Sequence, residues 1–256
     1  MTGDIDLAID GRVAEILLNR PAKLNTLTPA MFERLRDVCA RVNADESIHA
    51  VVLHGAGERA FCAGTDVNTL GEYEDFWAWR NRVDYVTQVR GIRKPVIAAL
   101  KGWVLGGGLE LAVACDLRVA AENAVLGAPE VALGWIGAGG TSQFLPRLVG
   151  YGQAMRILAT GERLPAAEAL RIGLVEEVVP PVDELPRARE LARRIAGHSP
   201  VATQAVKAAV RAALQGNLEL GLQIENELMA LCFAKGSDKA GAARFRARRE
   251  AHGGAI

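Results

Sequence analysis

The sequence predicts an α/β fold, and three observations support this class. Short apolar runs that are typical of strands alternate along the chain with segments in which apolar residues recur at helical spacing. Half of the 256 residues are hydrophobic, which is enough for a large core. The apolar run 96–100 also leads through three consecutive glycines, 106–108, into a helical pattern. A strand, a tight turn and a helix in succession form the unit from which α/β folds are built.

The composition excludes several classes of partner. Lysine plus arginine and aspartate plus glutamate both number 30, so no global charge attracts nucleic acid or an acidic membrane. The N-terminus lacks a basic region followed by an apolar run, and no segment approaches the roughly twenty apolar residues of a membrane span. The 4 cysteines are scattered, and the 4 histidines lack metal-ligand spacing. We therefore expect a cytoplasmic protein with reduced thiols and no metal site.

The N-terminal part begins with strands and a helix. Residues 5–18 alternate apolar and polar side chains around Asp10-Gly11, which predicts a β-hairpin. Thr28, with a proline directly after it, is typical of a helix N-terminus. The apolar residues 50–54 then predict another strand. This order starts the alternation of strands and helices on which the fold class rests.

Two glycine-bearing turns are candidate functional sites. The three glycines precede a helical pattern that carries one carboxylate, Glu110, among apolar residues. Free backbone N–H groups and the positive end of the helix dipole make such a helix start suitable for an oxygen that is or becomes negative. The alternative is a tight strand-to-helix turn packed against a neighbour. The other turn, 61–66, ends at Asp66, which is placed to cap the next helix and could serve only as that cap.

Two further segments do not follow a simple packing pattern. Residues 72–85 concentrate aromatic side chains, which predicts the wall of a pocket or an interface; a core helix is the alternative. Residues 125–140 are rich in glycine and contain Pro129-Glu130, and loops of this kind commonly carry function. The glycines at 137–140 do not make a dinucleotide-binding site, because their spacing is wrong and no strand directly precedes them.

The last part of the chain is mainly helical. Helical patterns cover residues 153–159, 165–171, 183–196, 200–214, 218–233 and 237–250, and a strand-like run covers 174–179. The final helix carries arginines at 244, 246, 248 and 249, the strongest local positive patch of the sequence. Taken alone, this patch is best explained as a solvated helical face.

Three stretches match one family in order and spacing: residues 60–66, 94–116 and 129–150. Together they resemble the enoyl-CoA hydratase/isomerase (crotonase) family. The resemblance extends from Asn19-Arg20-Pro21 to Arg249 and so covers nearly the whole chain. It implies a crotonase-like α/β core of repeated ββα units over 1–195 and a helical C-terminal trimerisation region over 196–256. It also implies a homotrimer or a homohexamer.

The resemblance implies an acyl-CoA site without a metal or redox cofactor, since coenzyme A is part of the substrate. By position, the backbone N–H groups of Thr65 and Gly107 form an oxyanion hole for the thioester oxygen. Thr65 stands where the family commonly has alanine, but the contact uses the backbone. Coenzyme A contacts fall on Ala22, Lys23, Leu24, Ala63, Asp66, Val67, Trp103 and Arg248.

Glu110 and Glu130 match the two glutamates of the hydratases. Addition of water to a conjugated double bond needs one group that takes a proton and another that delivers one, so paired carboxylates suit it. By resemblance, Glu110 positions and deprotonates water and Glu130 exchanges the proton at the α-carbon; the alternative is that one glutamate is only structural.

We therefore expect an enoyl-CoA hydratase that acts on a 2-enoyl-CoA thioester. Two other functions stay open: a double-bond isomerase or another enolate reaction of the same family, and a non-catalytic CoA- or RNA-binding protein. The neutral charge and the two glutamates argue against the last. The sequence does not specify the acyl group.

Overall fold

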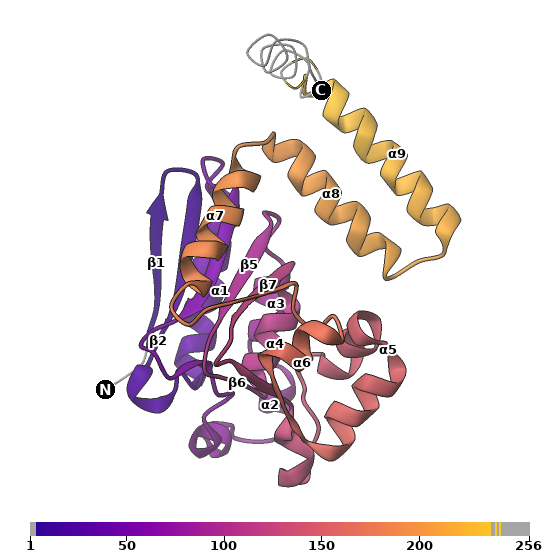
Figure 1. Cartoon of the computed structure of the whole chain (residues 1–256). Coiled ribbons are helices and arrows are strands. Elements are labelled where there is room, and N and C mark those ends of the chain that lie inside the picture. The colour runs from indigo at the N-terminus through magenta and orange to yellow at the C-terminus, as the bar shows by residue number, and fades with distance from the viewer. Residues whose placement is uncertain (1–3, 237–238, 240, 242–256) are drawn as a thin grey trace.

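The computed structural model describes residues 4–236, 239 and 241; the side chains of 70–72 lie outside this description. Within it, two sheets form the α/β core (Figure 1). The six-stranded sheet has the order β1-β2-β3-β5-β7-β10, with antiparallel pairing of β1 and β2 and parallel pairing elsewhere. Its strands are β1 (Asp4–Asp10), β2 (Val13–Asn19), β3 (Ala50–Gly55), β5 (Val96–Leu100), β7 (Leu117–Ala121) and β10 (Glu177–Val179).

A smaller sheet of four strands has the order β4-β6-β8-β9. These strands are β4 (Ala60–Cys62), β6 (Trp103–Leu105), β8 (Val125–Gly127) and β9 (Arg163–Pro165). In three successive units, β3-β4, β5-β6 and β7-β8, the first strand joins the large sheet and the second joins the small one. This arrangement confirms the predicted α/β class and its repeated ββα core.

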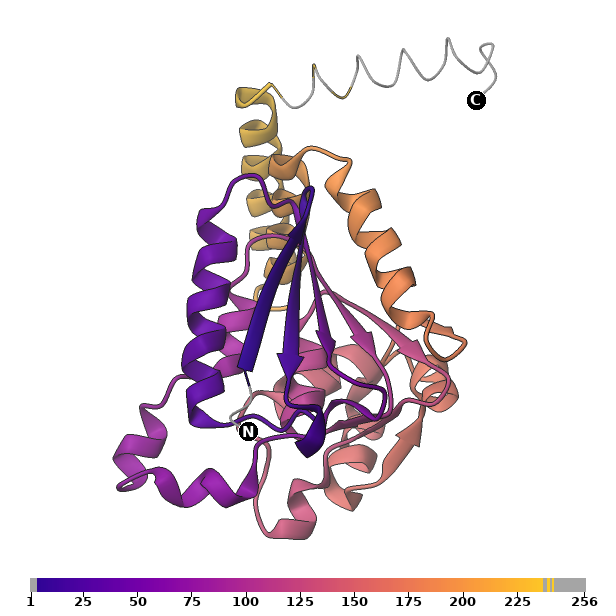
Figure 2. The same cartoon turned by 90° about the vertical axis from the view of Figure 1, so that its left-hand side faces the viewer.

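The helices cover both faces of the large sheet (Figure 2). On one face, side chains of α1, α3 and α4 pack with the sheet into the main core. On the other, the alanines of α7 pack on β3, β5 and β7. The bounds of the helices in the core are α1 (Pro29–Ala44), α2 (Phe76–Arg80), α3 (Tyr85–Arg90), α4 (Gly107–Ala114), α5 (Thr141–Thr160), α6 (Ala166–Arg171) and α7 (Glu184–Ala196).

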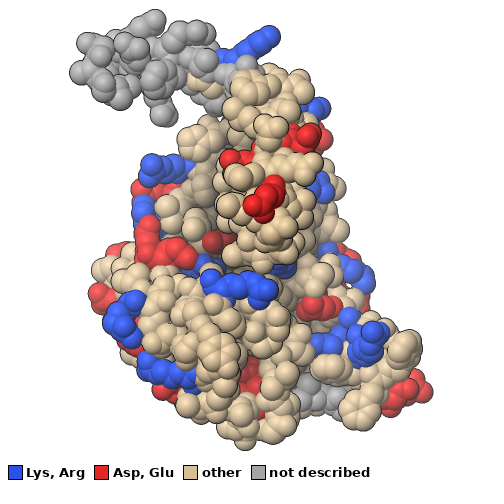
Figure 3. Space-filling model, turned by 90° about the vertical axis from the view of Figure 1, so that its right-hand side faces the viewer, with Lys and Arg blue, Asp and Glu red and all other residues tan. Residues whose placement is uncertain are grey.

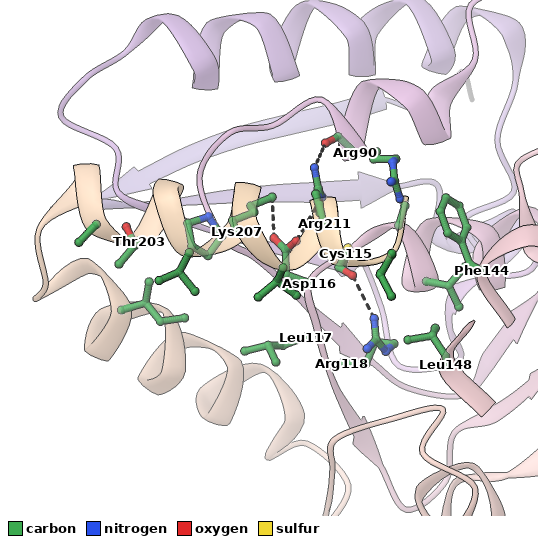
Figure 4. Close-up of a pocket in the computed structure, with 18 of the residues that line it drawn as sticks. Arg90, Cys115, Asp116, Leu117, Arg118, Phe144, Leu148, Thr203, Lys207 and Arg211 are labelled. Atoms are coloured by element: carbon green, nitrogen blue, oxygen red, sulfur yellow. Dashed lines mark hydrogen bonds and ion pairs between the residues drawn. The ribbon is translucent and has the colours of Figure 1, made fainter. Parts of the chain in front are cut away.

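Two C-terminal helices, α8 (Pro200–Ala213) and α9 (Leu218–Ala234), pack on each other and extend beyond the core (Figure 1). An ionic cluster joins α8 to the chain after α4. The carboxylate of Asp116 lies 2.6 Å from Lys207 Nζ and 3.1 Å from Arg211 Nη2 (Figure 4). Arg211 also donates to the Arg90 carbonyl. No residue of α9 is buried, so α9 presents apolar side chains to solvent in a single copy of the chain.

Local signals in the sequence account for most element boundaries. The Thr28 hydroxyl accepts from the Met31 amide at the start of α1, as expected for an N-cap. The Asp66 carboxylate accepts from the Asn68 amide, but the element it caps is the 3-10 helix η2 (Val67–Glu72). The cysteines are unpaired, as predicted. Within the described ranges, no helix is both long enough and apolar enough to cross a membrane.

Two predicted boundaries differ from the structure. The element α5 has a break at Gly150, whose φ is 78°; the helix predicted over 153–159 lies after this break, and the helical stretch from Thr141 up to it was not predicted. Of the strand expected over 174–179, only Glu177–Val179 pairs in the sheet. The helix predicted over 237–250, including Arg248, lies outside the described residues.

The glycine at 108 provides a test of this packing. A methyl group at Gly108 would lie 2.0 Å from the Cys62 carbonyl oxygen, so α4 and β4 would have to separate. We expect Gly108→Ala to lower the free energy of unfolding by about 1 to 3 kcal/mol, the usual cost of overpacking. Gly221→Ala in α9 is the control, because nothing lies within 4 Å of the added methyl group and alanine favours a helix. Denaturant unfolding measures both; equal stabilities would contradict the tight contact.

Candidate active site

A cavity of about 160 Å³ lies at the N-terminus of α4. Five parts of the chain line it: Phe32 of α1, the chain after β4, the aromatic segment up to Tyr85 at the start of α3, the first turn of α4 with Gly106 before it, and the 3-10 helix η3 (Pro129–Leu133) with the loop after it. Thr65, Gly107, Glu110 and Glu130 all belong to this lining. The fold therefore brings together, in one cavity, the predicted oxyanion-hole residues and both predicted catalytic glutamates.

The backbone amides of Thr65 and Gly107 lie side by side. A methyl group at Gly107 would be 3.4 Å from the Thr65 nitrogen, and one at Gly64 would be 3.4 Å from the Gly107 nitrogen. Gly64 has φ of 107° and Gly106 has φ of 53°, which turns the two segments toward each other. Neither amide has an acceptor among the described residues. The two N–H groups are free to donate to the same oxygen.

Glu110 is buried, with 2 % of its surface exposed. Its Oε2 accepts a hydrogen bond from the Tyr85 hydroxyl at 2.5 Å, and its Oε1 accepts one from the Gly139 amide at 2.6 Å. Burial raises the pKa of Glu110, whereas these two hydrogen bonds act in the opposite direction because they stabilise the carboxylate. The side chain is thus fixed by two donors.

Glu130 lies across the same space in a different environment. Its Oε2 is buried without a hydrogen-bond partner among the described residues. Burial raises the pKa of Glu130, and the negative charge of Glu110 raises it further. A hydrogen bond from its own backbone acts in the opposite direction, so burial is the largest of these effects on the pKa of Glu130.

The glycine-rich loop after η3 closes over both carboxylates. A methyl group at Gly137 would lie 2.7 Å from Glu110 Oε1 and 3.4 Å from Glu130 Oε1. One at Gly139 would lie 2.4 Å from Glu110 Oε2. Because these glycines carry no side chain, they let the backbone approach the carboxylates. The segment is therefore rich in glycine although it lacks the glycine spacing of a nucleotide-binding loop.

Tyr85 is the functional candidate that the sequence did not single out. It was expected only as one aromatic residue in 72–85, yet its hydroxyl bridges Glu110 and the Thr65 side chain. Burial raises the pKa of Tyr85, so the hydroxyl stays protonated and can donate. Asp84 caps α3 directly before it, and this capping signal was available in the sequence.

The aromatic segment divides between the cavity and the surface. Tyr73, Trp79 and Tyr85 line the cavity, as the pocket-wall prediction required. Phe76 and Trp77 are 91 % and 68 % exposed, so the core-helix alternative was wrong for α2. The cavity also includes Arg82, a cationic residue that the sequence did not indicate as part of a site.

The predicted coenzyme A residues lie around two adjoining segments. Leu24, which follows the 3-10 helix η1 (Pro21–Lys23), accepts at its carbonyl from the Ala63 amide, so residues 22–24 and 63–67 are neighbours. Ala22, Lys23 and Val67 are exposed there.

Two of these residues have other contacts. The Asp66 carboxylate is 2.8 Å from Arg20 Nη1 and caps η2, so its contacts are with other parts of the protein. Trp103 lies on β6, with the Arg163 guanidinium over its ring, and is not among the residues that line the described cavity.

A larger cavity, of about 750 Å³, lies elsewhere, between α8 and the end of α4 (Figure 4). Its walls are mostly apolar, and Asp116, Lys207 and Arg211 are engaged with one another in the ionic cluster. Arg118 is likewise engaged, with Glu176 and the Cys115 carbonyl. The candidate active site is therefore the smaller cavity, where buried carboxylates lack charged partners.

Comparison with known proteins identifies the family. A family model described as enoyl-CoA hydratase/isomerase matches residues 8–254. The chain belongs to the enoyl-CoA hydratase/isomerase family. It is therefore an enzyme of a family that acts on acyl-CoA thioesters.

Relatives with this fold match the chain over almost its full length. A short-chain-enoyl-CoA hydratase of Clostridium acetobutylicum is 36% identical over 98% of this chain and 97% of its own. A crotonyl-CoA hydratase of Syntrophomonas wolfei is 37% identical over 97% of each chain. The crystal structure of an enoyl-CoA hydratase from Bacillus anthracis superposes with a TM-score of 0.88, at 36% identity, over 95% of this chain and 96% of that one.

The Tyr85 contact of this family member can be tested by titration. Tyr85→Phe removes a hydrogen bond that stabilises the Glu110 carboxylate, so the pKa of Glu110, already raised by burial, should rise further. The carboxylate form should then appear only at higher pH. Carbon-13 NMR of labelled glutamate measures the titration, and Tyr151→Phe, at a residue 75% exposed on α5, is the control. An unchanged or lower midpoint in Tyr85→Phe would show that the hydrogen bond does not stabilise the carboxylate.

Proposed function

We propose that this enzyme adds water to a 2-enoyl-CoA thioester. The observation that carries the proposal is the placement of two carboxylates, the buried Glu110 and the half-buried Glu130, around one cavity that is also lined by Thr65 and Gly107, whose backbone amides are free. The thioester oxygen gains negative charge as the hydroxyl group adds to C3. Donors held in place at Thr65 and Gly107 stabilise this oxygen more in the transition state than in the ground state.

The two glutamates have environments suited to opposite proton transfers. Glu110, with its two hydrogen-bond donors, is suited to be ionised and to take a proton from water as the oxygen bonds to C3. Glu130, with its unpartnered oxygen, is suited to be protonated and to deliver its proton to C2 when the enolate collapses. Burial raises the pKa of both groups, and two carboxyl groups in one cavity can supply the base and the acid of one reaction.

Binding of the substrate needs no further cofactor in this proposal, because coenzyme A activates the acyl group as its thioester. The neighbouring segments 22–24 and 63–67 are proposed to hold the coenzyme A part of the substrate. In this proposal their backbone groups make the contacts, because the Asp66 side chain is paired with Arg20. The roles of Trp103 and Arg248 in coenzyme A binding stay predictions.

Substitution of each glutamate tests the assignment. Glu110→Gln and Glu130→Gln should each lower hydration of crotonyl-CoA by at least about a hundredfold, the scale of general acid-base catalysis. Glu122→Gln, in the exposed turn after β7, is the matched control and should keep full activity. Loss of the conjugated absorbance measures the rate, and circular dichroism checks the fold.

Two outcomes would contradict the assignment. Full activity of either folded glutamine variant would remove that residue from the mechanism. Retention of double-bond isomerisation in Glu110→Gln, with hydration lost, would favour an isomerase that needs only Glu130.

We also propose that the enzyme assembles as a trimer or as a pair of trimers. Apolar side chains on α9 are solvent-exposed in the single chain: Leu218, Leu220, Leu222, Met229, Leu231 and Phe233 are each 46% to 71% exposed. Cavities of about 750 and 590 Å³ adjoin α8, on its core side and on its α9 side. Figure 3, which views the side where α9 lies, shows mostly uncharged residues. A surface of this kind is typical of a protein interface.

Sedimentation tests this assembly. The wild-type enzyme should sediment as three or six copies at micromolar concentration, because association removes the exposed apolar face of α9 from water. Leu222→Glu should shift the distribution toward monomers, since it places a charge on that face. Val182→Glu, at a valine before α7 that is 74% exposed, should leave it unchanged. A stable and active wild-type monomer would contradict the proposal.

A further inference from the structure

Arg82 is the cationic residue in the lining of the active-site cavity. Around it, the lining is aromatic or aliphatic, with Phe32, Trp79, Leu133, Trp135 and Ile136. Leu133, Trp135 and Ile136 are 44% to 77% exposed, so this part of the wall is open to solvent, and a guanidinium in it offers N–H donors to a charged group of a ligand.

Arg82 is held in place by Trp79. Its Cζ lies 4.0 Å from the centroid of the Trp79 ring, and its Nη1 donates to the Trp79 carbonyl at 2.9 Å. Stacking on an indole and a backbone hydrogen bond fix the plane of the guanidinium while other N–H donors stay available. The side chain is therefore ordered before any ligand arrives.

No carboxylate in the described part of the chain forms an ion pair with Arg82. The nearest acidic residue in sequence, Asp84, uses its carboxylate elsewhere: it accepts from the Val86 amide and from the Thr87 hydroxyl at the start of α3. Arg82 and Glu110 both line this cavity. Burial raises the pKa of Glu110, and the positive charge of Arg82 acts to lower it.

The planar guanidinium fork matches a carboxylate, which it can bind through two parallel hydrogen bonds. The thioester carbonyl is assigned to the amides at the start of α4, so a carboxylate that reaches Arg82 must lie on the acyl group. We propose that Arg82 binds a carboxylate at the far end of the acyl chain, and that the preferred substrates are enoyl-CoA thioesters of dicarboxylic acids. This inference rests on the proposed hydratase function.

Two substrates that differ only in this carboxylate test the proposal. Crotonyl-CoA has a but-2-enoyl group, and glutaconyl-CoA has the same group with a carboxylate on C4. We expect wild-type enzyme to hydrate glutaconyl-CoA with a kcat/KM at least about tenfold higher, and Arg82→Gln to lower this preference by about tenfold to a hundredfold. Arg82→Lys, which keeps the charge but loses the fork, should fall between them.

The chain offers a matched control. Arg80 also stacks on a tryptophan, with its Cζ 5.4 Å from the Trp77 ring centroid, but it is exposed and is not in the cavity lining. Arg80→Gln should keep the wild-type preference. Equal losses in Arg80→Gln and Arg82→Gln would indicate a general effect of surface charge and would overturn the proposal.

Pantetheine thioesters of the same two acids separate the acyl carboxylate from the phosphates of coenzyme A. If Arg82 binds the acyl group, the loss of preference in Arg82→Gln persists with these shorter thioesters. If Arg82→Gln instead weakens both coenzyme A thioesters equally and neither pantetheine thioester, Arg82 contacts a phosphate and the proposal is wrong.

Binding of unreactive analogues distinguishes failure of this proposal from failure of the hydratase function. Glutaryl-CoA and butyryl-CoA are saturated, so calorimetry measures their affinities without hydration. Tighter binding of glutaryl-CoA that is lost in Arg82→Gln supports the carboxylate site even if neither enoyl thioester is hydrated, in which case only the hydratase assignment fails. Equal affinities in the wild-type enzyme would overturn the carboxylate site even if crotonyl-CoA is hydrated rapidly.

Discussion

The backbone contact between the first turn of α4 and the chain around β4 is the constraint on which the active site depends. Gly108 packs against the Cys62 carbonyl, and Gly107 lies beside the Tyr85 hydroxyl, with no room for a side chain at either position. Because main-chain atoms make this contact, it fixes the relative positions of the Thr65 and Gly107 amides. It also places Glu110, which follows in the same turn of the helix, at the adjoining cavity.

The two catalytic candidates differ in their local environments as well as in their positions. Both catalytic candidates are carboxylates with pKa values raised by burial, yet only Glu110 receives two hydrogen bonds, while one oxygen of Glu130 has no partner in the described structure. The two carboxylates thus share a cavity but differ in the hydrogen-bond donors that reach them. Tyr85 contributes to that difference from a helix outside α4, and its own contact with Thr65 joins it to the oxyanion-hole segment.

The C-terminal helices differ from the core in how little of their surface is buried. The Asp116 cluster attaches α8 at one end, but α9 buries none of its side chains, and cavities remain on both sides of α8. Exposed apolar surface of this kind is unfavourable in water, which is the physical basis of the assembly proposed above. The residues that line the described active-site cavity all precede these helices in the sequence.

The sequence by itself determined the α/β class, the hairpin, the cap at Thr28 and the glutamate in the first turn of α4, because these depend on periodicity and on signals within a few residues. It also identified the family, since motifs of the family occur in the same order along nearly the whole chain. Only the tertiary structure decided that α5 begins at Thr141, that Phe76 and Trp77 are exposed, and that Tyr85 and Arg82 face the same cavity as Glu110. These outcomes depend on which segments the two sheets bring together, and contacts between segments far apart in the sequence leave no local pattern from which to read them.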